Sequence, residues 1–338
     1  MLEIKDLVAE CRDGFVKGLS LSVSEKGIFG ILCAHSADRS AIAHVICGCA
    51  DKESGEVLIN GEAVTRKNLK ARKKIRLVPR ELSIDSMTTP VEYLDFVADA
   101  LGVATDKKYR QVSEALELLC LDEDANRPFF SLNKVERCRL SIAAALIGNP
   151  DCIVIDDSFS GIDRKSISDI FELLKMLGKR KILILLSHKP GEIKELCDSI
   201  AIVSYGAVAI EGSIAEIERK INATRELHIS AKGEADNILE AIKSVQNVID
   251  VKITATNANK ISTVVIEHYP DAFMKDKVFN ALGGVNSQML SFKEVKLDIE
   301  DVYYSLTAAD AKRMENTESG STVTKSKKGK KLAWRNKR

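Results

Sequence analysis

The stretch Cys152-Ile-Val-Ile-Asp-Asp157 indicates the fold class of this chain of 338 residues. A second apolar run, Ile182-Leu-Ile-Leu-Leu186, follows it after residues 164–177, whose apolar spacing is helical. Continuous apolar runs of this length are typical of central strands in a parallel sheet, because both faces of such strands are buried. The strand–helix–strand order therefore predicts a βαβ unit and an α/β fold.

The residues around this unit continue the α/β pattern. Alternation and β-branched residues predict strands at 2–5, 19–23, 27–32, 57–62 and 75–78. Helical apolar spacing occurs at 40–47, 91–102, 109–121 and 134–147. Residues 200–203 and 207–210 are predicted to pair as a hairpin across Tyr205-Gly206.

A second block begins at about residue 225. Its expected order is strand 226–231, helix 235–246, strands 248–255 and 261–267, helix 271–282 and strand 288–296. This βαββαβ order predicts a small ferredoxin-like α/β domain of the split-βαβ kind, closed by a short helix at 299–308. We expect three regions: a domain at 1–222, the small domain at 225–308, and a polar tail at 309–338 that is disordered.

The composition is that of a globular protein, with 45% apolar and 29% charged residues. The net charge of +1 favours no class of partner, but the stretch from Lys325 to Arg338 holds eight Lys or Arg and no acid. This basic tail is interpreted as a solvated charge run or as a contact to an anionic membrane surface that includes Trp334. Nucleic acid is the least favoured partner, because the tail offers one aromatic residue for base stacking.

Most of the eight cysteines lie in apolar runs, which favours small buried side chains in a reducing cytosol. Cys47 and Cys49 lack the second ligand pair of a zinc site. The first residues contain no signal-peptide core, and no apolar run approaches the ~20 residues of a membrane span. If the protein serves a membrane, we expect it to act through another chain.

Several motifs follow one another in a recognisable order. The octet Cys33-Ala-His-Ser-Ala-Asp-Arg-Ser40 joins a strand to a helix, where a phosphate-binding loop is expected. It is followed by Gly148-Asn-Pro150, Ser158-Phe-Ser-Gly-Ile-Asp163, Leu185-Leu-Ser-His188 and the stretch from Glu195 to Gly206. In order and spacing, residues 1–220 resemble the ATP-binding-cassette (ABC) family, and Leu297 to Thr307 resembles the end of bacterial exporter subunits that carry a small C-terminal domain. The resemblance implies a P-loop NTPase cassette with a mostly parallel core sheet, an antiparallel β subdomain and a helical subdomain.

The resemblance also implies roles for five residues. Asp156 and Ser40 fall where the family binds magnesium, and Asp157 falls where it has a general-base Glu. His188 matches the switch histidine that contacts the γ-phosphate, and Asp163 matches the D-loop Asp. Asp157 is one methylene shorter than Glu, so the attacking water would lie farther from its carboxylate. The alternatives are that Asp156 and Asp157 simply end a strand and that His188 is a structural histidine.

The phosphate loop departs from the family's glycine-rich pattern. Cys33, Ser36 and Asp38 replace glycines, Arg39 replaces the Lys, and Ala41 follows the retained Ser40. Gly allows the backbone to approach phosphates closely, and the Asp38 carboxylate is expected to repel the β- and γ-phosphates. Arg39 is interpreted either as a phosphate ligand or as one partner of an internal salt bridge to Asp38 or another acid. Cys33 is either an inert residue or a reactive thiol near a helix N-terminus.

The signature segment and the Q-loop depart from the family as well. The family's Leu-Ser-Gly-Gly-Gln falls on Leu132, Asn133, Lys134, Val135 and Glu136. Asn133 retains the capacity to cap the following helix, whereas the next three residues add bulk and a negative charge where a phosphate approaches. Arg80 stands at the Q-loop Gln position, and no aromatic residue occurs near Cys11-Arg12, where the family stacks adenine.

The resemblance and its departures together predict a cytoplasmic subunit, peripheral at the inner face of the cell membrane. It would couple ATP and Mg²⁺ to a multi-span permease encoded by another chain, with Arg80 and residues 86–100 facing that permease. Family cassettes act as dimers, here homo- or heterodimers, and damage to both halves of the composite site predicts weak or absent ATP binding and hydrolysis. The alternatives are a slow but active ABC ATPase and a non-catalytic scaffold or regulatory subunit.

Overall fold

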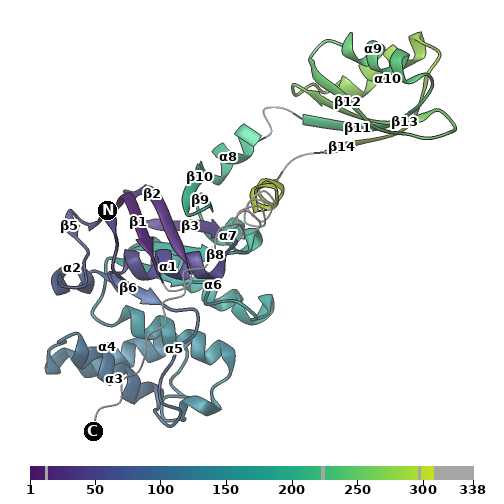
Figure 1. Cartoon of the computed structure of the whole chain (residues 1–338). Coiled ribbons are helices and arrows are strands. Elements are labelled where there is room, and N and C mark those ends of the chain that lie inside the picture. Colours follow the sequence, from purple (N-terminus) through teal and green to yellow (C-terminus); the bar gives the residue numbers. More distant parts are fainter. Residues whose placement is uncertain (12–13, 222–224, 296–297, 308–338) are drawn as a thin grey trace, which may run out of the picture.

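The computed structural model describes residues 1–11, 14–221, 225–295 and 298–307, which form a larger and a smaller body (Figure 1). The larger body contains a central sheet, an antiparallel sheet and a group of helices, and the smaller body contains a four-stranded sheet with two helices. The basic tail and the Arg12 position lie outside the described residues, so what was expected of them stays a prediction.

The central sheet has six strands in the order β10-β9-β3-β8-β7-β6. Their bounds are β3 (Gly27–Cys33), β6 (Ile75–Val78), β7 (Cys152–Asp156), β8 (Ile182–Ser187), β9 (Ser199–Ser204) and β10 (Ala207–Ser213). All neighbours pair in parallel except β9 and β10. Every residue of β7 and β8 is buried, which confirms the expectation drawn from their apolar runs. The carboxyl ends of β3, β8 and β7 therefore lie side by side.

The antiparallel sheet has the order β2-β1-β4-β5 and lies over α1 (Ser36–Ile46). Its strands are β1 (Leu2–Glu10), β2 (Phe15–Val23), β4 (Ser54–Ile59) and β5 (Glu62–Ala63), and the short α2 (Leu69–Lys73) follows them. One buried cluster joins this sheet to the central sheet through α1, with Leu7 and Leu19 on one side, Ile42 and Ile46 in the helix, and Ile31 in β3. Helix α1 is thus held firmly at the end of β3.

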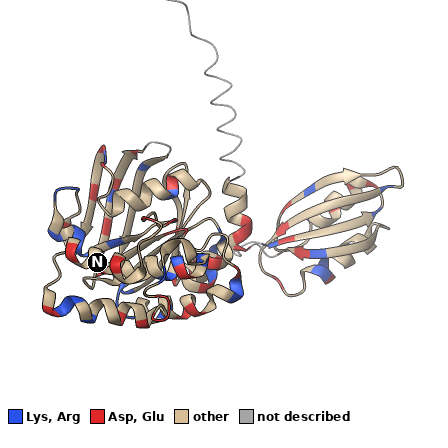
Figure 2. Cartoon of the chain, turned by 90° about the horizontal axis from the view of Figure 1, so that it is seen from below, with Lys and Arg blue, Asp and Glu red and all other residues tan. Residues whose placement is uncertain are grey.

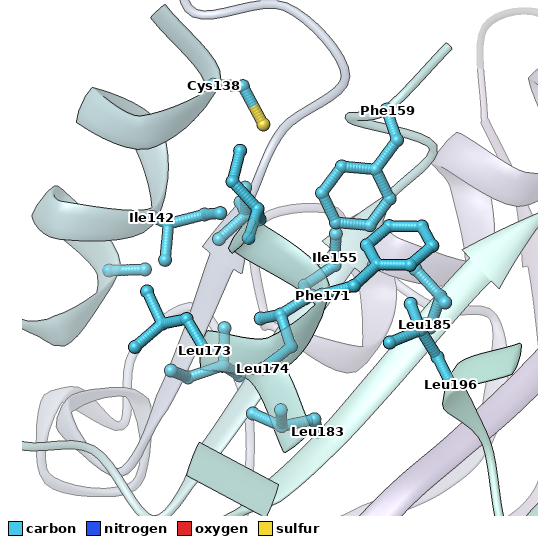
Figure 3. Close-up of a cluster of buried hydrophobic side chains, with 14 of the residues drawn as sticks. Cys138, Ile142, Ile155, Phe159, Phe171, Leu173, Leu174, Leu183, Leu185 and Leu196 are labelled. Carbon is cyan, nitrogen blue, oxygen red and sulfur yellow. The ribbon is translucent and has the colours of Figure 1, made fainter. Parts of the chain in front are cut away.

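The remaining helices pack on the opposite side of the central sheet. They are α3 (Pro90–Ala100), α4 (Thr105–Leu118), α5 (Lys134–Leu146), α6 (Arg164–Gly178), α7 (Pro190–Leu196) and α8 (Ile214–Ile221), with a 3₁₀ turn at Phe129–Ser131. Phe159 meets Phe171 edge to face at 5.4 Å between ring centres, beside Ile155 and Leu185 of the sheet (Figure 3). This cluster fixes the strand ends that carry the candidate site.

The smaller body has the strand order β12-β13-β11-β14, entirely antiparallel. Its elements are β11 (Arg225–Lys232), α9 (Ala235–Lys243), β12 (Val248–Thr256), β13 (Ile261–His268), α10 (Met274–Gly284) and β14 (Gln288–Val295). Both helices cover one face of the sheet, and a separate core contains Ile229, Ile242 and Val278 (Figure 1). The βαββαβ order and this pairing confirm the ferredoxin-like prediction.

After β14 the chain returns to the larger body. Residues 299–307 are helical, and Ile299 and Tyr303 are buried in the core cluster that also contains Ile193 of α7. Lys194 of α7 forms an ion pair with Asp298 at 2.8 Å. This C-terminal helix therefore packs against α7, next to the strand ends of the central sheet (Figure 1).

Two sequence-based expectations need correction. Helix α1 begins at Ser36 rather than near Ser40, because the octet contains no glycine and its Asp38 lies in the first turn, where an acid stabilises a helix. Cys49 and Cys120 are exposed, although five of the eight cysteines are buried as expected. Within the described residues, no helix combines the length and the apolar character that a membrane span requires. In the view of Figure 2, basic and acidic residues are interspersed along both bodies.

Candidate functional site

The candidate site lies at the carboxyl ends of β3, β7 and β8. The loop after β3, Asp156 and Asp157 at the end of β7, and His188 after β8 all meet there. The structure thus brings together residues that stand more than a hundred positions apart in the chain, as expected for an open α/β sheet.

Arg39 occupies the centre of this site. Its guanidinium group donates to the carbonyl oxygens of Cys33 at 2.7 Å and Ala34 at 3.1 Å, and to the Asp157 carboxylate at 3.0 Å. The Arg39 side chain is only 3% exposed and the Asp157 side chain is fully buried. Of the two interpretations of Arg39, the internal salt bridge is therefore the one that this conformation adopts, and its acid is Asp157.

The start of α1 changes the shape of the phosphate loop. Residues 36–40 are already helical, so the loop is reduced to Ala34 and His35 after the end of β3. The backbone N–H of Arg39 donates to His35 within the helix, at 3.1 Å. A phosphate loop needs N–H groups that point into an open cradle, and here Arg39 fills the cradle with a guanidinium group that is bonded to the loop carbonyls. The residues present do not fit a triphosphate while Arg39 holds this position.

Both carboxylate oxygens of Asp157 already have partners. Its Oδ2 accepts from Arg39 and lies 3.9 Å from Arg80 Nε, and its Oδ1 is 3.1 Å from His188 Nδ1. Its backbone φ is +47°, an uncommon conformation that Asp tolerates better than most residues. A general base has to contact the water that it deprotonates, and the Asp157 side chain is fully buried in this conformation.

Asp156 and Ser40 form a second polar pair. The Ser40 hydroxyl donates to Asp156 Oδ2 at 2.7 Å, and Asp156 Oδ1 is buried without a partner in the described structure. Burial raises the pKa of Asp156, and the Ser40 hydrogen bond opposes that rise. A hydroxyl and a carboxylate are the oxygen ligands that Mg²⁺ prefers. These two residues fit a magnesium ion, although the neighbouring Arg39 supplies a competing positive charge.

The Asp38 carboxylate is engaged elsewhere. Its Oδ1 accepts from the backbone N–H of Phe15 at the start of β2, at 3.0 Å, and the residue is buried. An added Cβ at Gly14 would lie 2.3 Å from the carbonyl oxygen of Ala37, so β2 approaches α1 as closely as backbones allow. Asp38 thus ties β2 to the first turn of α1, and the repulsion expected between Asp38 and phosphate stays a prediction.

An open hollow of about 490 Å³ lies outside the first turns of α1. Its walls contain Cys11, Gly14, Ser36, Ala37, Ser40, Ala41, His44, Ala50 and Arg80. None of these described residues is Phe, Tyr or Trp. Ser36 and Ala41 therefore line this hollow, whereas Cys33 is buried and does not line it.

The signature segment forms the N-terminus of α5, and side chains of the segment itself accept hydrogen bonds from backbone N–H groups at that terminus. The Asn133 side chain accepts from the N–H groups of Val135 at 2.9 Å and Glu136 at 3.0 Å, and the Glu136 carboxylate accepts from the Asn133 N–H at 2.7 Å. This capping box uses donors that the family directs at a phosphate. Leu132 is buried, and Lys134 is exposed on the first turn.

Asp163 has a local structural contact. It caps α6 by accepting from the Ser166 N–H at 3.0 Å and the Ser166 hydroxyl at 2.6 Å. These hydrogen bonds lower the pKa of Asp163. The described contacts do not join Asp163 to the Arg39–Asp157 pair, so its D-loop role stays a prediction.

Sequence reasoning missed Tyr303. This residue of the C-terminal helix is 3% exposed, and burial, together with the nearby Cys33 and Asp157, raises its pKa to about 12. The charge of Arg39 also acts on Tyr303, and Tyr303 shares a buried cluster with Ala34, so the C-terminal helix lies near the candidate site. The aromatic pair Tyr303-Tyr304 inside the closing helical pattern was the signal available in the sequence.

Comparison with known proteins places this geometry in context. Residues 16–160 match the family model described as ABC transporter. The chain is 28% identical over 239 residues to the linearmycin resistance ATP-binding protein LnrL of Bacillus subtilis, covering 70% of this chain and 77% of that protein. It is 31% identical over 199 residues to the Nod factor export ATP-binding protein I of a Rhizobium strain, covering 59% and 66%.

Another relative extends over nearly the whole length. The chain is 27% identical over 335 residues to the methionine import ATP-binding protein MetN of Helicobacter hepaticus, covering 88% of this chain and 95% of that protein. By contrast, it spans only 27% of ABC transporter A family member 8 of Dictyostelium discoideum.

Solved structures agree on the fold. The ATP-binding subunit of an ABC transporter superposes with a TM-score of 0.58 at 21% identity, covering 65% of this chain and 92% of that one. A dimeric ATP-binding cassette in a post-hydrolysis state, bound to ADP and phosphate, gives 0.55 at 20% identity, covering 63% and 98%. The larger body therefore has the P-loop ABC ATPase fold.

Proposed function

We propose, from the premise that residues 16–160 form an ATP-binding domain of the ABC transporter family, that this chain is a transporter subunit whose own nucleotide site is closed. It occupies the place of an ATP-binding subunit beside a separate membrane permease, at the inner face of the membrane, and pairs with a second cassette. Its ATP binding is weak or absent and its hydrolysis is lost.

The buried ion pair between Arg39 and Asp157 carries this proposal. A single guanidinium group fills the phosphate cradle and at the same time binds the carboxylate at the general-base position. Opening the site requires both charges to separate inside a nearly water-free region, where removing one partner of such a pair costs about 3–5 kcal/mol. The contacts that ATP makes in the site would have to offset the cost of separating Arg39 from Asp157, which lowers the affinity for ATP.

The capping box of α5 supports the same proposal from the other half of a composite site. A partner cassette would present its phosphate to N–H groups that Asn133 and Glu136 already occupy. The Glu136 carboxylate would also lie close to that phosphate and repel it. Two copies of this chain would therefore form two closed sites, and a partner with an intact signature would still meet Arg39.

The exposed apolar side chains of the helical part support a permease partner. Met87, Phe96 and Phe130 are each at least 60% exposed, and the Phe130 N–H donates to the Ser86 carbonyl, which places Phe130 beside Met87. Exposed apolar groups of this size mark interaction surfaces. They lie in or next to the segment 86–100, which the family resemblance assigns to the permease.

Calorimetry with Mg-ATP and a phosphate-release assay test the closed site. The wild-type chain is expected to show no heat of binding at millimolar Mg-ATP and the same background phosphate release as Asp157→Asn. Arg39→Lys is expected to increase binding, because a lysine ammonium group lacks the planar fork whose two nitrogens contact the loop carbonyls and Asp157 separately. Turnover by the wild type that Asp157→Asn abolishes would establish the slow ABC ATPase instead.

Co-purification tests the permease partner. Membranes of the source cell are expected to yield a multi-span protein with the tagged wild-type chain but not with Phe96→Ser. Leu69→Ser is the matched control, since Leu69 is 65% exposed in α2, outside the segment 86–100. Equal recovery with both variants, or no multi-span protein with the wild type, would favour the scaffold or regulatory subunit.

A further inference from the structure

A second cavity lies inside the larger body, between residues 79–82, the first half of α5 and Ser158. Its volume is about 450 Å³. Leu82, Leu132 and Cys138 form its apolar wall. Neither Arg39 nor Asp157 lines it, although Arg80 lines both this cavity and the hollow outside α1.

Cationic side chains dominate the polar wall of this cavity. Arg80, Lys134 and Arg137 line it, against one acid, Glu81. Arg80 approaches Asp157 only at 3.9 Å, and Lys134 has no ion-pair partner in the part of the chain that the structure describes. The cavity therefore has a surplus of positive charge close to apolar surface.

Arg137 is held in place with donors to spare. Its guanidinium group lies over the Phe129 ring at 4.7 Å and donates one N–H to the Phe130 carbonyl at 3.1 Å. Its Nε is buried and has no acceptor among the described residues. A positioned guanidinium with an unused N–H is the usual way to bind a carboxylate or a phosphate.

Ser141 supplies a second unsatisfied group. It is 4% exposed, lies one helical turn after Arg137 on the same face of α5, and lines the cavity. Its hydroxyl group is buried and has no partner in the described residues. A buried hydroxyl without a partner costs free energy, and an oxygen atom placed in the cavity would satisfy it.

We propose that this cavity binds a small organic anion. A carboxylate or phosphate monoester group would face Lys134, Arg137 and the Ser141 hydroxyl, and a short apolar portion would pack on Leu82 and Leu132. The volume is within the range of small-molecule sites. Because residues 79–82 follow β6, the edge strand of the central sheet, and α5 belongs to the helical part, the bound anion would connect these two parts of the body. The proposal does not depend on nucleotide binding or on a permease.

Titration calorimetry of the full chain with phenyl phosphate and with benzoate tests the site. Each probe has an anionic group and one ring, and their relative affinities show whether phosphate or carboxylate is preferred. At least one probe is expected to bind more tightly than inorganic phosphate, which has the anionic group without the ring, and more tightly than phenol, which has the ring without the anionic group. Lys134→Gln, Arg137→Gln and Ser141→Ala are each expected to weaken binding, the two charge changes by about tenfold.

Arg139→Gln is the matched control, because Arg139 lies on the same helix but pairs with Asp169 instead of lining the cavity. It is expected to leave binding unchanged. The proposal is overturned if neither probe binds, if Arg139→Gln weakens binding as much as Lys134→Gln, or if only Ser40→Ala weakens it, which would locate the probe at the nucleotide site. Lys134 is exposed, so its variant keeps the test valid even where Arg137→Gln does not fold.

Discussion

Replacing Arg39 by Met tests the central ion pair by its stability. The substitution keeps most of the apolar volume but leaves Asp157 charged and buried, and it removes the donors of the Cys33 and Ala34 carbonyls. At the observed 3.0 Å, the attraction between unit charges is about 5–6 kcal/mol for an effective dielectric constant of 20. Desolvation offsets part of this, so the expected loss is about 3–5 kcal/mol.

Urea unfolding followed by far-ultraviolet circular dichroism measures that loss. The single tryptophan, Trp334, lies outside the described residues, so fluorescence is the weaker probe. For the larger body, such a loss corresponds to a decrease in Tm on the order of 10 °C. The double variant Arg39→Met with Asp157→Asn is expected to recover most of the stability, because no unpaired charge remains. An Arg39→Met protein within about 1 kcal/mol of wild type, or a double variant as unstable as the single one, would refute the reasoning.

Three further expectations concern other contacts. Burial raises the pKa of Asp156 above its ordinary 3.8, so the folded state binds the Asp156 proton more tightly than the unfolded state does. The free energy of unfolding therefore falls as the pH rises from the unfolded pKa of 3.8 through the higher folded pKa. Asp156→Asn should remove this fall, measured as the difference in unfolding free energy between pH 4 and pH 7; an unchanged difference would contradict it. The Lys277 hydrogen bond lowers the pKa of Asp271 to about 2, so this carboxylate stabilises the smaller body above pH 3.8 and the stability is lost as the pH falls toward 2. Lys277→Met should reduce that acid-dependent loss in circular dichroism, whereas a loss of wild-type size would argue against the contact. Tyr303→Ala should cost about 3–5 kcal/mol and speed proteolysis next to the C-terminal helix, since the ring is buried against the larger body; unchanged cleavage would mean that the helix is held by other contacts.

The architecture was predictable because its signals are local. The apolar runs of β7 and β8 and the helical spacing of α6 each depend on residues close together in the chain, and the βαββαβ order of the second block is a series of such local signals. The positions of Asp156, Asp157 and His188 at strand ends followed from the same pattern. Element bounds were less predictable: α1 begins at Ser36 rather than near Ser40, because the octet contains no glycine, and β2 begins at Phe15 rather than at residue 19.

The sequence alone determined that this chain is an α/β protein with a cassette-like order of motifs, a ferredoxin-like second body and an altered phosphate loop. Only the tertiary structure decided which contacts the residues of the altered loop make. The Arg39–Asp157 contact joins residues 118 positions apart, and Tyr303 reaches the same site from the far end of the chain. No local pattern encodes such a contact, because its geometry depends on how β3, β7 and α1 pack together. The physical difference is one of range: the periodicity of apolar residues along the chain specifies elements, whereas burial in a shared core specifies which charges meet.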